Sequence, residues 1–108
     1  MKETAHLTSK AHYYEETGDY RKAERLLSRA IAIKEAALGA DHFELAEDYH
    51  NIGLLNLALE NHDKAEEFLV RALGLRRQHL GVNHPDVLET LNYLALVQLE
   101  HDFAITHW

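Results

Sequence analysis

The chain has 108 residues, no cysteine and a formal net charge of −7, from 11 basic and 18 acidic side chains. Its length suits one domain with its own core, and the lack of cysteine excludes disulfides and thiolate metal sites. The acidic balance argues against nucleic acid as a partner, because affinity for phosphate backbones depends on Lys and Arg. No apolar run approaches the ~18 residues of a membrane span, so we expect a soluble protein. The lack of cysteine fits a reducing compartment, and the N-terminus lacks the apolar core of a signal peptide, so we expect it in the cytoplasm.

Two helices are predicted in the first part of the chain. The first covers residues 3–17 and ends at Gly18-Asp19. The second covers residues 20–38, where apolar residues between Ala23 and Ile33 recur at helical spacing. Gly39 follows directly, placed to take the left-handed conformation that often ends a helix.

Three further helices are predicted at residues 43–59, 62–80 and 86–100. Asp41 and Asn83 each precede an acidic residue by three positions, which is the pattern of a helix start, and Pro85 suits a first helical turn. Asn61 stands where Asp19 stands in the first part of the chain, and we expect both side chains to cap the helices that follow.

The sequence repeats itself at a shift of 42 residues. Of the 21 positions from 22 to 42, nine are identical at that shift, among them Lys22-Ala23-Glu24 and Lys64-Ala65-Glu66. A fixed period of this length indicates stacked supersecondary units. We therefore predict a single-domain, all-α solenoid of antiparallel helix hairpins, with a first repeat at about 3–42, a second at about 43–84, a half-repeat capping helix at about 85–101 and a tail at 102–108.

These residues resemble the tetratricopeptide repeat in its 42-residue, kinesin-light-chain-like type. Ala11, Gly53 and Ala95 are small residues where first helices would be crossed. The segments from Leu38 to His42 and from Leu80 to Pro85 look like the Leu-Gly-x-x-His-Pro linker of that type. The resemblance implies a non-catalytic interaction module or scaffold, whose first helices line a concave face that receives a peptide or protein segment.

One stripe of side chains gives a version of that face from spacing alone. Residues at i, i+4 and i+7 share one side of a helix, and the 42-residue shift carries such a set from the first helix to the third and fifth. The predicted partner-binding stripe is Thr8, His12, Glu15, His50, Leu54, Leu57, Asn92, Leu96 and Leu99. Each leucine would contribute ~1.5 kcal/mol or more to affinity, with the polar end setting register. The alternative is that the superhelix buries these leucines against neighbouring first helices.

Neither catalysis nor metal binding is predicted. The chain has no Gly-x-Ser-x-Gly turn, no Gly-rich phosphate loop and no two histidines at i and i+4. His101 and His107 lie near Asp102, where only an incidental metal is expected. We therefore predict a protein that is not an enzyme and has no cofactor.

Two other functions stay open alongside binding of a basic or apolar partner segment. The helix at 86–100 has apolar groups around most of its circumference, so the chain could self-assemble through it, as a homodimer or by swapping, together with Phe103 and Trp108. The chain could also be the sensor domain of a larger regulatory protein.

Overall fold

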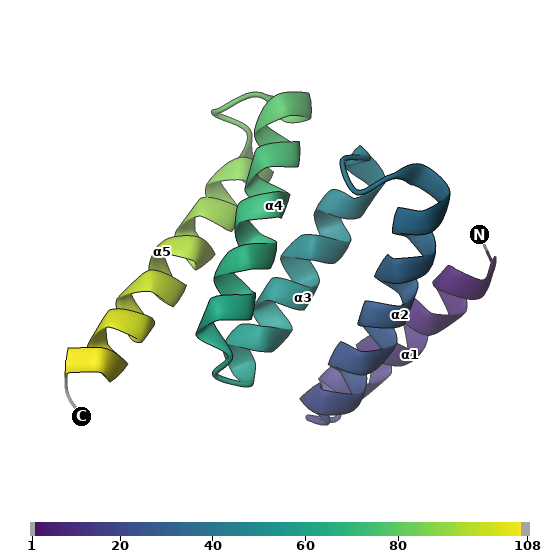
Figure 1. Cartoon of the computed structure of the whole chain (residues 1–108), viewed down its shortest axis with the longest axis horizontal. Coiled ribbons are helices and arrows are strands. Elements are labelled where there is room, and N and C mark those ends of the chain that lie inside the picture. Colours follow the sequence, from purple (N-terminus) through teal and green to yellow (C-terminus); the bar gives the residue numbers. More distant parts are fainter. Residues whose placement is uncertain (1, 107–108) are drawn as a thin grey trace.

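The helices of the chain stack side by side in sequence order, with the two chain ends at opposite sides of the row (Figure 1). The computed structural model describes residues 2–106, and the side chains of residues 2–103. Its elements are α1 (Lys2–Glu16), α2 (Tyr20–Leu38), the 3₁₀ turn η1 (Phe43–Leu45), α3 (Ala46–Ala58), α4 (His62–Leu80) and α5 (Pro85–Thr106). All regular structure in this range is helical, so the predicted all-α solenoid is confirmed.

The helix limits agree with the sequence for α2 and α4 and differ at two places. The predicted helix over 43–59 begins with the tighter turn η1 before α3 starts at Ala46. The last helix, expected to end near residue 100, continues to Thr106 and takes in most of the predicted tail. Its sequence permits this, because no Gly or Pro, the two strongest helix breakers, follows Pro85. Residues 107 and 108 of that tail, with Trp108, lie outside the described residues.

Histidines, rather than Asp41 and Asn83, cap the turns that follow the linkers. The Nδ1 atom of His42 accepts a hydrogen bond from the backbone N–H of Glu44 at 3.2 Å, and Nδ1 of His84 accepts one from that of Asp86 at 3.1 Å. An imidazole nitrogen thus satisfies one of the free N–H groups that a helix start leaves without a partner. The prediction that Asp41 and Asn83 would cap these turns was wrong by one position. The histidine repeated at both linkers could have identified the capping residue.

Gly39 and Gly81 end α2 and α4 with positive φ, as expected for residues after a helix. Their ψ angles, 150° and 158°, place them outside the left-handed helical region, in extended backbone that only glycine adopts readily. Both linkers therefore leave their helix in the same direction, which gives successive hairpins the same relative placement.

The two expected caps at the hairpin turns behave differently. Asp19 accepts a hydrogen bond from the backbone N–H of Lys22 at 3.3 Å, which confirms it as a cap. Asn61 makes no such bond. Its side chain instead donates to the Oδ1 atom of the buried Asn56 at 3.3 Å, so the second turn is held to α3 rather than to the start of α4.

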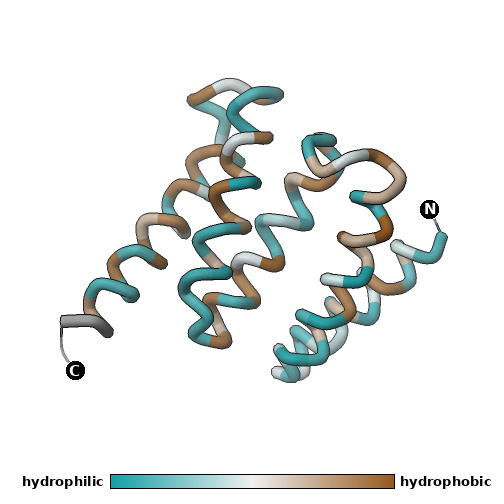
Figure 2. The backbone as a smooth tube through the Cα atoms, in the orientation of Figure 1, coloured by the Kyte–Doolittle hydropathy of each residue, from teal (hydrophilic) through white to brown (hydrophobic). Residues whose placement is uncertain are grey.

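The core consists of two apolar clusters that share helix α4. The first joins α1, α2, α3 and part of α4 around the fully buried Tyr49. The second joins α4 to α5 through Leu69, Leu73, Val87 and Val97. Each hairpin therefore packs against the next through these clusters. Figure 2 shows apolar residues recurring along every helix.

Gly53 marks the close approach of α3 and α4. A Cβ atom at this position would lie 2.7 Å from Cγ and 2.9 Å from Cδ2 of the fully buried Leu69. Real carbon atoms do not approach so closely, so the two helices can only pack at this distance because residue 53 has no side chain. The expectation of a small residue at this crossing is confirmed.

Replacing Gly53 by Ala should lower stability, although alanine is the better helix former. Overpacking typically costs about 1 to 3 kcal/mol, which exceeds the gain of up to about 1 kcal/mol in helix propensity. Gly74→Ala is the matched control, because nothing lies within 4 Å of a Cβ there, and it should raise stability. Urea unfolding measures both variants, and a gain in stability for Gly53→Ala would contradict the packing argument.

Candidate functional site

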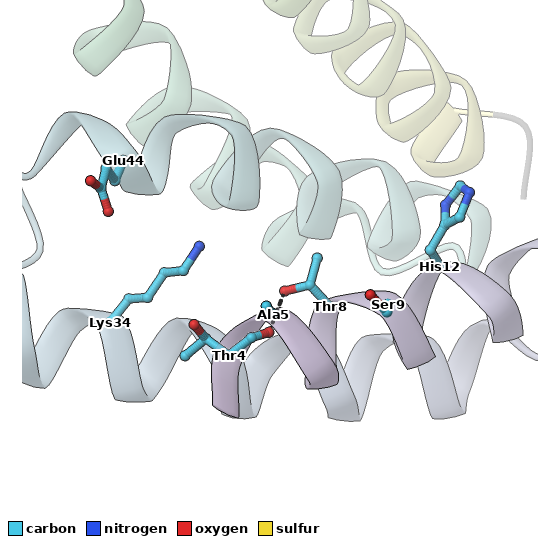
Figure 3. Close-up of a pocket in the computed structure, with 7 residues that line it drawn as sticks. All are labelled: Thr4, Ala5, Thr8, Ser9, His12, Lys34 and Glu44. Carbon is cyan, nitrogen blue, oxygen red and sulfur yellow. Dashed lines mark hydrogen bonds between the residues drawn. The ribbon is translucent and has the colours of Figure 1, made fainter. Parts of the chain in front are cut away.

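A groove of about 610 Å³ opens between α1 and the segment that starts the second hairpin. α1 supplies most of its wall, α2 supplies one lysine and η1 one glutamate. The lining residues are Thr4, Ala5, Thr8, Ser9, His12, Lys34 and Glu44. Figure 3 shows Thr8 and His12 pointing away from α1, Lys34 rising from the neighbouring α2 and Glu44 across the space from it.

Helical spacing brings the α1 residues to the groove. Ala5, Ser9 and His12 stand at i, i+4 and i+7 and so share one side of the helix. The hydroxyl of Thr8 donates to the carbonyl oxygen of Thr4 at 2.8 Å, which fixes its side chain along the wall. Nε2 of His12 lies 3.0 Å from Oε1 of Glu16, so the imidazole is held at the end of the groove.

The groove exists because α1 carries small side chains where α3 carries larger ones. At the 42-residue shift, Ala5, Thr8 and Ser9 correspond to Glu47, His50 and Asn51. In the second hairpin His50 reaches across to α5. Thr8 is too short to span the same gap to α3, and α1 and α3 are barely in contact.

A buried ion pair closes the inner side of the groove. Nζ of Lys34 on α2 lies 2.7 Å from Oδ2 of Asp48 on α3, and their side chains are 20% and 7% exposed. The buried Asp48 carboxylate needs this close partner, because an unpaired buried charge is strongly destabilising. The pair therefore fixes the separation of the first hairpin from α3 and neutralises the lysine that lines the groove.

A tyrosine reinforces the same junction. The hydroxyl of Tyr49 lies 2.6 Å from Oε2 of Glu35 and 3.2 Å from the carbonyl oxygen of Ala40. Burial and the neighbouring Glu35 carboxylate raise the pKa of Tyr49 to about 12, against a smaller opposite effect of Arg71. The phenol is thus a neutral donor that ties α3 to the end of α2.

The second junction repeats this arrangement with different chemistry. At the 42-residue shift Lys34 becomes Arg76 and Asp48 becomes Thr90. Nη1 of the buried Arg76 donates to Oγ1 of Thr90 at 2.9 Å and to the carbonyl oxygen of Asp86 at 3.2 Å. No role was assigned to Arg76 from the sequence. The signal that was missed was the lysine or arginine at equivalent positions of both repeats.

His50 completes this second network. Its Nδ1 lies 3.0 Å from Oγ1 of Thr90 and its Nε2 lies 3.0 Å from Oε1 of Glu89, so it joins α3 to α5 at two points. Burial, followed by the nearby charge of Arg76, lowers the pKa of His50 from its ordinary value of 6.5. The single proton of the Thr90 hydroxyl is shared between two acceptors, the carbonyl oxygen of Asp86 at 3.1 Å and Nδ1 of a neutral His50 whose Nε2–H donates to Glu89.

The structure distributes the predicted stripe over four environments. Thr8 and His12 line the groove, while Glu15 is exposed on α1 and does not line it. His50 is 3% exposed and bonded to α5. Leu54 and Leu57 are half-buried against the second core cluster, as in the alternative that the sequence left open. The three members on α5, Asn92, Leu96 and Leu99, are exposed.

Among the described residues, no group of three or more His, Asp or Glu side chains is arranged to hold a metal ion. The rings of His62 and His101 lie 5.5 Å apart between centroids, with Glu100 3.8 Å from His62 and Asp63 3.6 Å from His101. These pairs link the start of α4 to the last turns of α5. His107, named with His101 in the sequence, lies outside the described residues.

Comparisons with known proteins agree on the fold. A family model described as tetratricopeptide repeat matches residues 3–78 and again residues 49–104. The crystal structure of BtubC (BKLC) from P. vanneervenii is similar, with a TM-score of 0.84 and 21% sequence identity over 91% of this chain and 39% of that one. No curated protein matches the chain. None of the described helices has the length and apolarity needed to cross a membrane.

His50 should make stability depend on pH below about 7, the range in which the unfolded chain's histidine takes up its proton. Because its pKa is lower in the folded chain than in the unfolded one, the unfolded chain binds the extra proton, and the free energy of unfolding falls as the pH drops below about 6.5. His50→Asn can keep the contact with Thr90 but cannot titrate. Denaturant unfolding at several pH values should show a smaller loss for the variant. Parallel losses in both proteins would contradict this assignment.

Proposed function

The chain belongs to the tetratricopeptide repeat family, and on this premise we propose that it binds a segment of a partner protein in the groove between α1 and η1. Repeat modules of this family are in general protein-interaction modules. The observation that carries the proposal is the groove itself, a concave space on the first-helix side, lined by polar side chains that the fold holds in place.

The chemistry of the groove favours an extended polar segment. Ser9 is exposed and its hydroxyl can both donate and accept a hydrogen bond, as can the imidazole of His12. Lys34 is neutralised by Asp48, so the inner side attracts neither charge strongly. Backbone amides and uncharged polar side chains of a partner match these groups better than a strongly charged segment does.

The predicted stripe enters this proposal in part. Thr8 and His12 are the proposed contact residues, with Glu15 beyond them on α1. His50, Leu54 and Leu57 support the surface from the interior, since they join α3 to α4 and α5. Asn92, Leu96 and Leu99 extend the proposed surface onto α5, where a longer segment would reach them.

We also propose that this module has no catalytic activity and acts in the cytoplasm. The polar groups at the groove are bonded to one another as structural pairs, as in Thr8 with Thr4 and Lys34 with Asp48, rather than arranged as a nucleophile with its base. The absence of cysteine supports a reducing compartment.

A charge placed in the groove should weaken segment binding. Peptides would be selected on the wild-type chain from a random displayed library, and their affinity measured for Ala5→Glu and Ala32→Glu. Both alanines are exposed, and Ala5 lines the groove whereas Ala32 does not. We expect Ala5→Glu to weaken binding about tenfold or more, and Ala32→Glu to change it by less than about twofold.

Circular dichroism would establish that both variants keep their helices. Peptides that bind both variants with the wild-type affinity would contradict the proposed site. Leu54 and Leu57 are unsuitable for this test, because both pack against the second core cluster and a charge there would disturb the fold itself.

A further inference from the structure

A small hollow lies between the starts of the two second helices, α2 and α4. Its volume is about 280 Å³, and Figure 1 shows both helix starts at the same edge of the row. The hollow stays open because α2 packs on α1 and α3 but hardly touches α4. It shares no lining residue with the groove between α1 and η1. The residues that line this basic hollow are Arg21, Glu24, Arg25, Leu59, Asn61 and Lys64.

Three of these lining residues are basic and have no carboxylate partner. Arg21 and Arg25 stand at i and i+4 on α2, so they share one side of that helix, and Lys64 comes from the first turn of α4. All three are exposed, and none forms an ion pair with another described residue. Lys34 and Arg71, by contrast, lie beside carboxylates of neighbouring helices. Three unpaired cations around one small space attract an anion.

The charge of the lining indicates which anion fits. Glu24 is the acidic residue of the lining, and it accepts a hydrogen bond from the hydroxyl of Ser28 at 3.3 Å. Three basic residues and one acidic residue give the lining a net charge of +2. A phosphorylated side chain carries about −1.5 to −2 at pH 7 and has three acceptor oxygens. It matches this lining better than a singly charged carboxylate does, and arginine can bind phosphate through two parallel hydrogen bonds.

The surface beside the basic hollow has the opposite charge. A second hollow of about 410 Å³ on α4, here called the acidic hollow, is lined by Asp63, Glu66, Glu67, Val70 and Arg71. Its arginine lies 3.5 Å from a carboxylate oxygen of Glu67. A run of acidic residues or a flat anionic membrane would be repelled by these carboxylates. A single phosphate group with basic residues beside it would be attracted at both places.

The repeat shows that the fold does not need the basic side chains of α2. At the 42-residue shift, Arg21 and Arg25 correspond to Asp63 and Glu67 of α4. Both helices have 19 residues and the same limits relative to the repeat. A second helix therefore forms equally well with either charge at these two positions. The positive charge of the basic hollow is a local exception in a chain whose net charge is −7.

We propose that the basic hollow binds the phosphate group of a phosphorylated side chain in a partner protein, with Arg21, Arg25 and Lys64 as the donors. Basic residues of the same partner segment pair with the acidic hollow on α4. This site goes beyond the groove between α1 and η1, because it lies on the second helices and recognises a modification rather than an unmodified segment.

Peptides with a central phosphoserine and random flanking residues serve as the probe. Peptides would be selected on the wild-type chain, and each would then be synthesised with phosphoserine, serine or glutamate at the centre. We expect the selected flanks to be rich in Lys and Arg. Fluorescence polarisation should show that the phosphoserine form binds at least about tenfold more tightly than either of the other two forms.

Single-charge variants locate the site. Arg21→Gln, Arg25→Gln and Lys64→Gln should each weaken binding of the phosphoserine form about tenfold, whereas Glu24→Gln should strengthen it. Arg29→Gln is the matched control, because Arg29 is exposed on the same helix but does not line the basic hollow. It should change the affinity by less than about twofold at physiological salt. Circular dichroism would establish that all variants keep their helices.

The other outcomes are distinct. Equal affinity for the phosphoserine and serine forms, or no binding up to about 1 mM peptide, would overturn the proposal. So would an equal loss in Arg29→Gln and Arg25→Gln, which would mean a diffuse charge effect. Tight binding of the glutamate form would assign the site to carboxylates, and binding to phosphatidylserine vesicles without binding to the peptides would assign it to a membrane. Ala5→Glu should bind like wild type, which separates failure of this proposal from failure of the groove.

Discussion

The arrangement of the hairpins depends on one basic side chain near the end of each second helix, half-buried at Lys34 and buried at Arg76. Lys34 and Arg76 are equivalent in the repeat, and each reaches an oxygen on the next first helix, Asp48 at 2.7 Å and Thr90 at 2.9 Å. A buried cation left without an acceptor would destabilise the fold by several kcal/mol, typically about 3 to 5. The apolar clusters must therefore pack so that Lys34 reaches Asp48 and Arg76 reaches Thr90. These two contacts thereby restrict the distance and direction from one hairpin to the next.

The two junctions are equivalent in position but differ in what they leave open. At the second, His50 bonds to Thr90 and Glu89 and brings α3 against α5. At the first, the equivalent residue is Thr8, which bonds within its own helix. The space that His50 fills in one place is a groove in the other. A difference of a few side-chain atoms at equivalent positions thus makes one junction a structural contact, through His50, and leaves a candidate binding groove at the other, beside Thr8.

The ends of the row have a related property. Each first helix needs cover on the side that faces its second helix, and Leu7 and Tyr49 have it. Leu91 occupies the same position on α5 and is 38% exposed. Because the register of helix packing is repeated, a helix that covered this side of α5 would run antiparallel to it, although no such helix is among the described residues.

The sequence by itself determined the helices, their order and the family, because the 42-residue period, Gly39, Gly81 and Asp19 act locally and leave few alternatives. It also indicated that Gly53 lies at a crossing. Only the tertiary structure decided which faces of the first helices are covered. Helical spacing groups His12, His50 and Leu54 on equivalent sides, yet His12 is exposed, His50 is bonded to α5 and Leu54 packs against the core. The physical reason is that exposure depends on the distance to the neighbouring helix, and the side chains on both helices set that distance together.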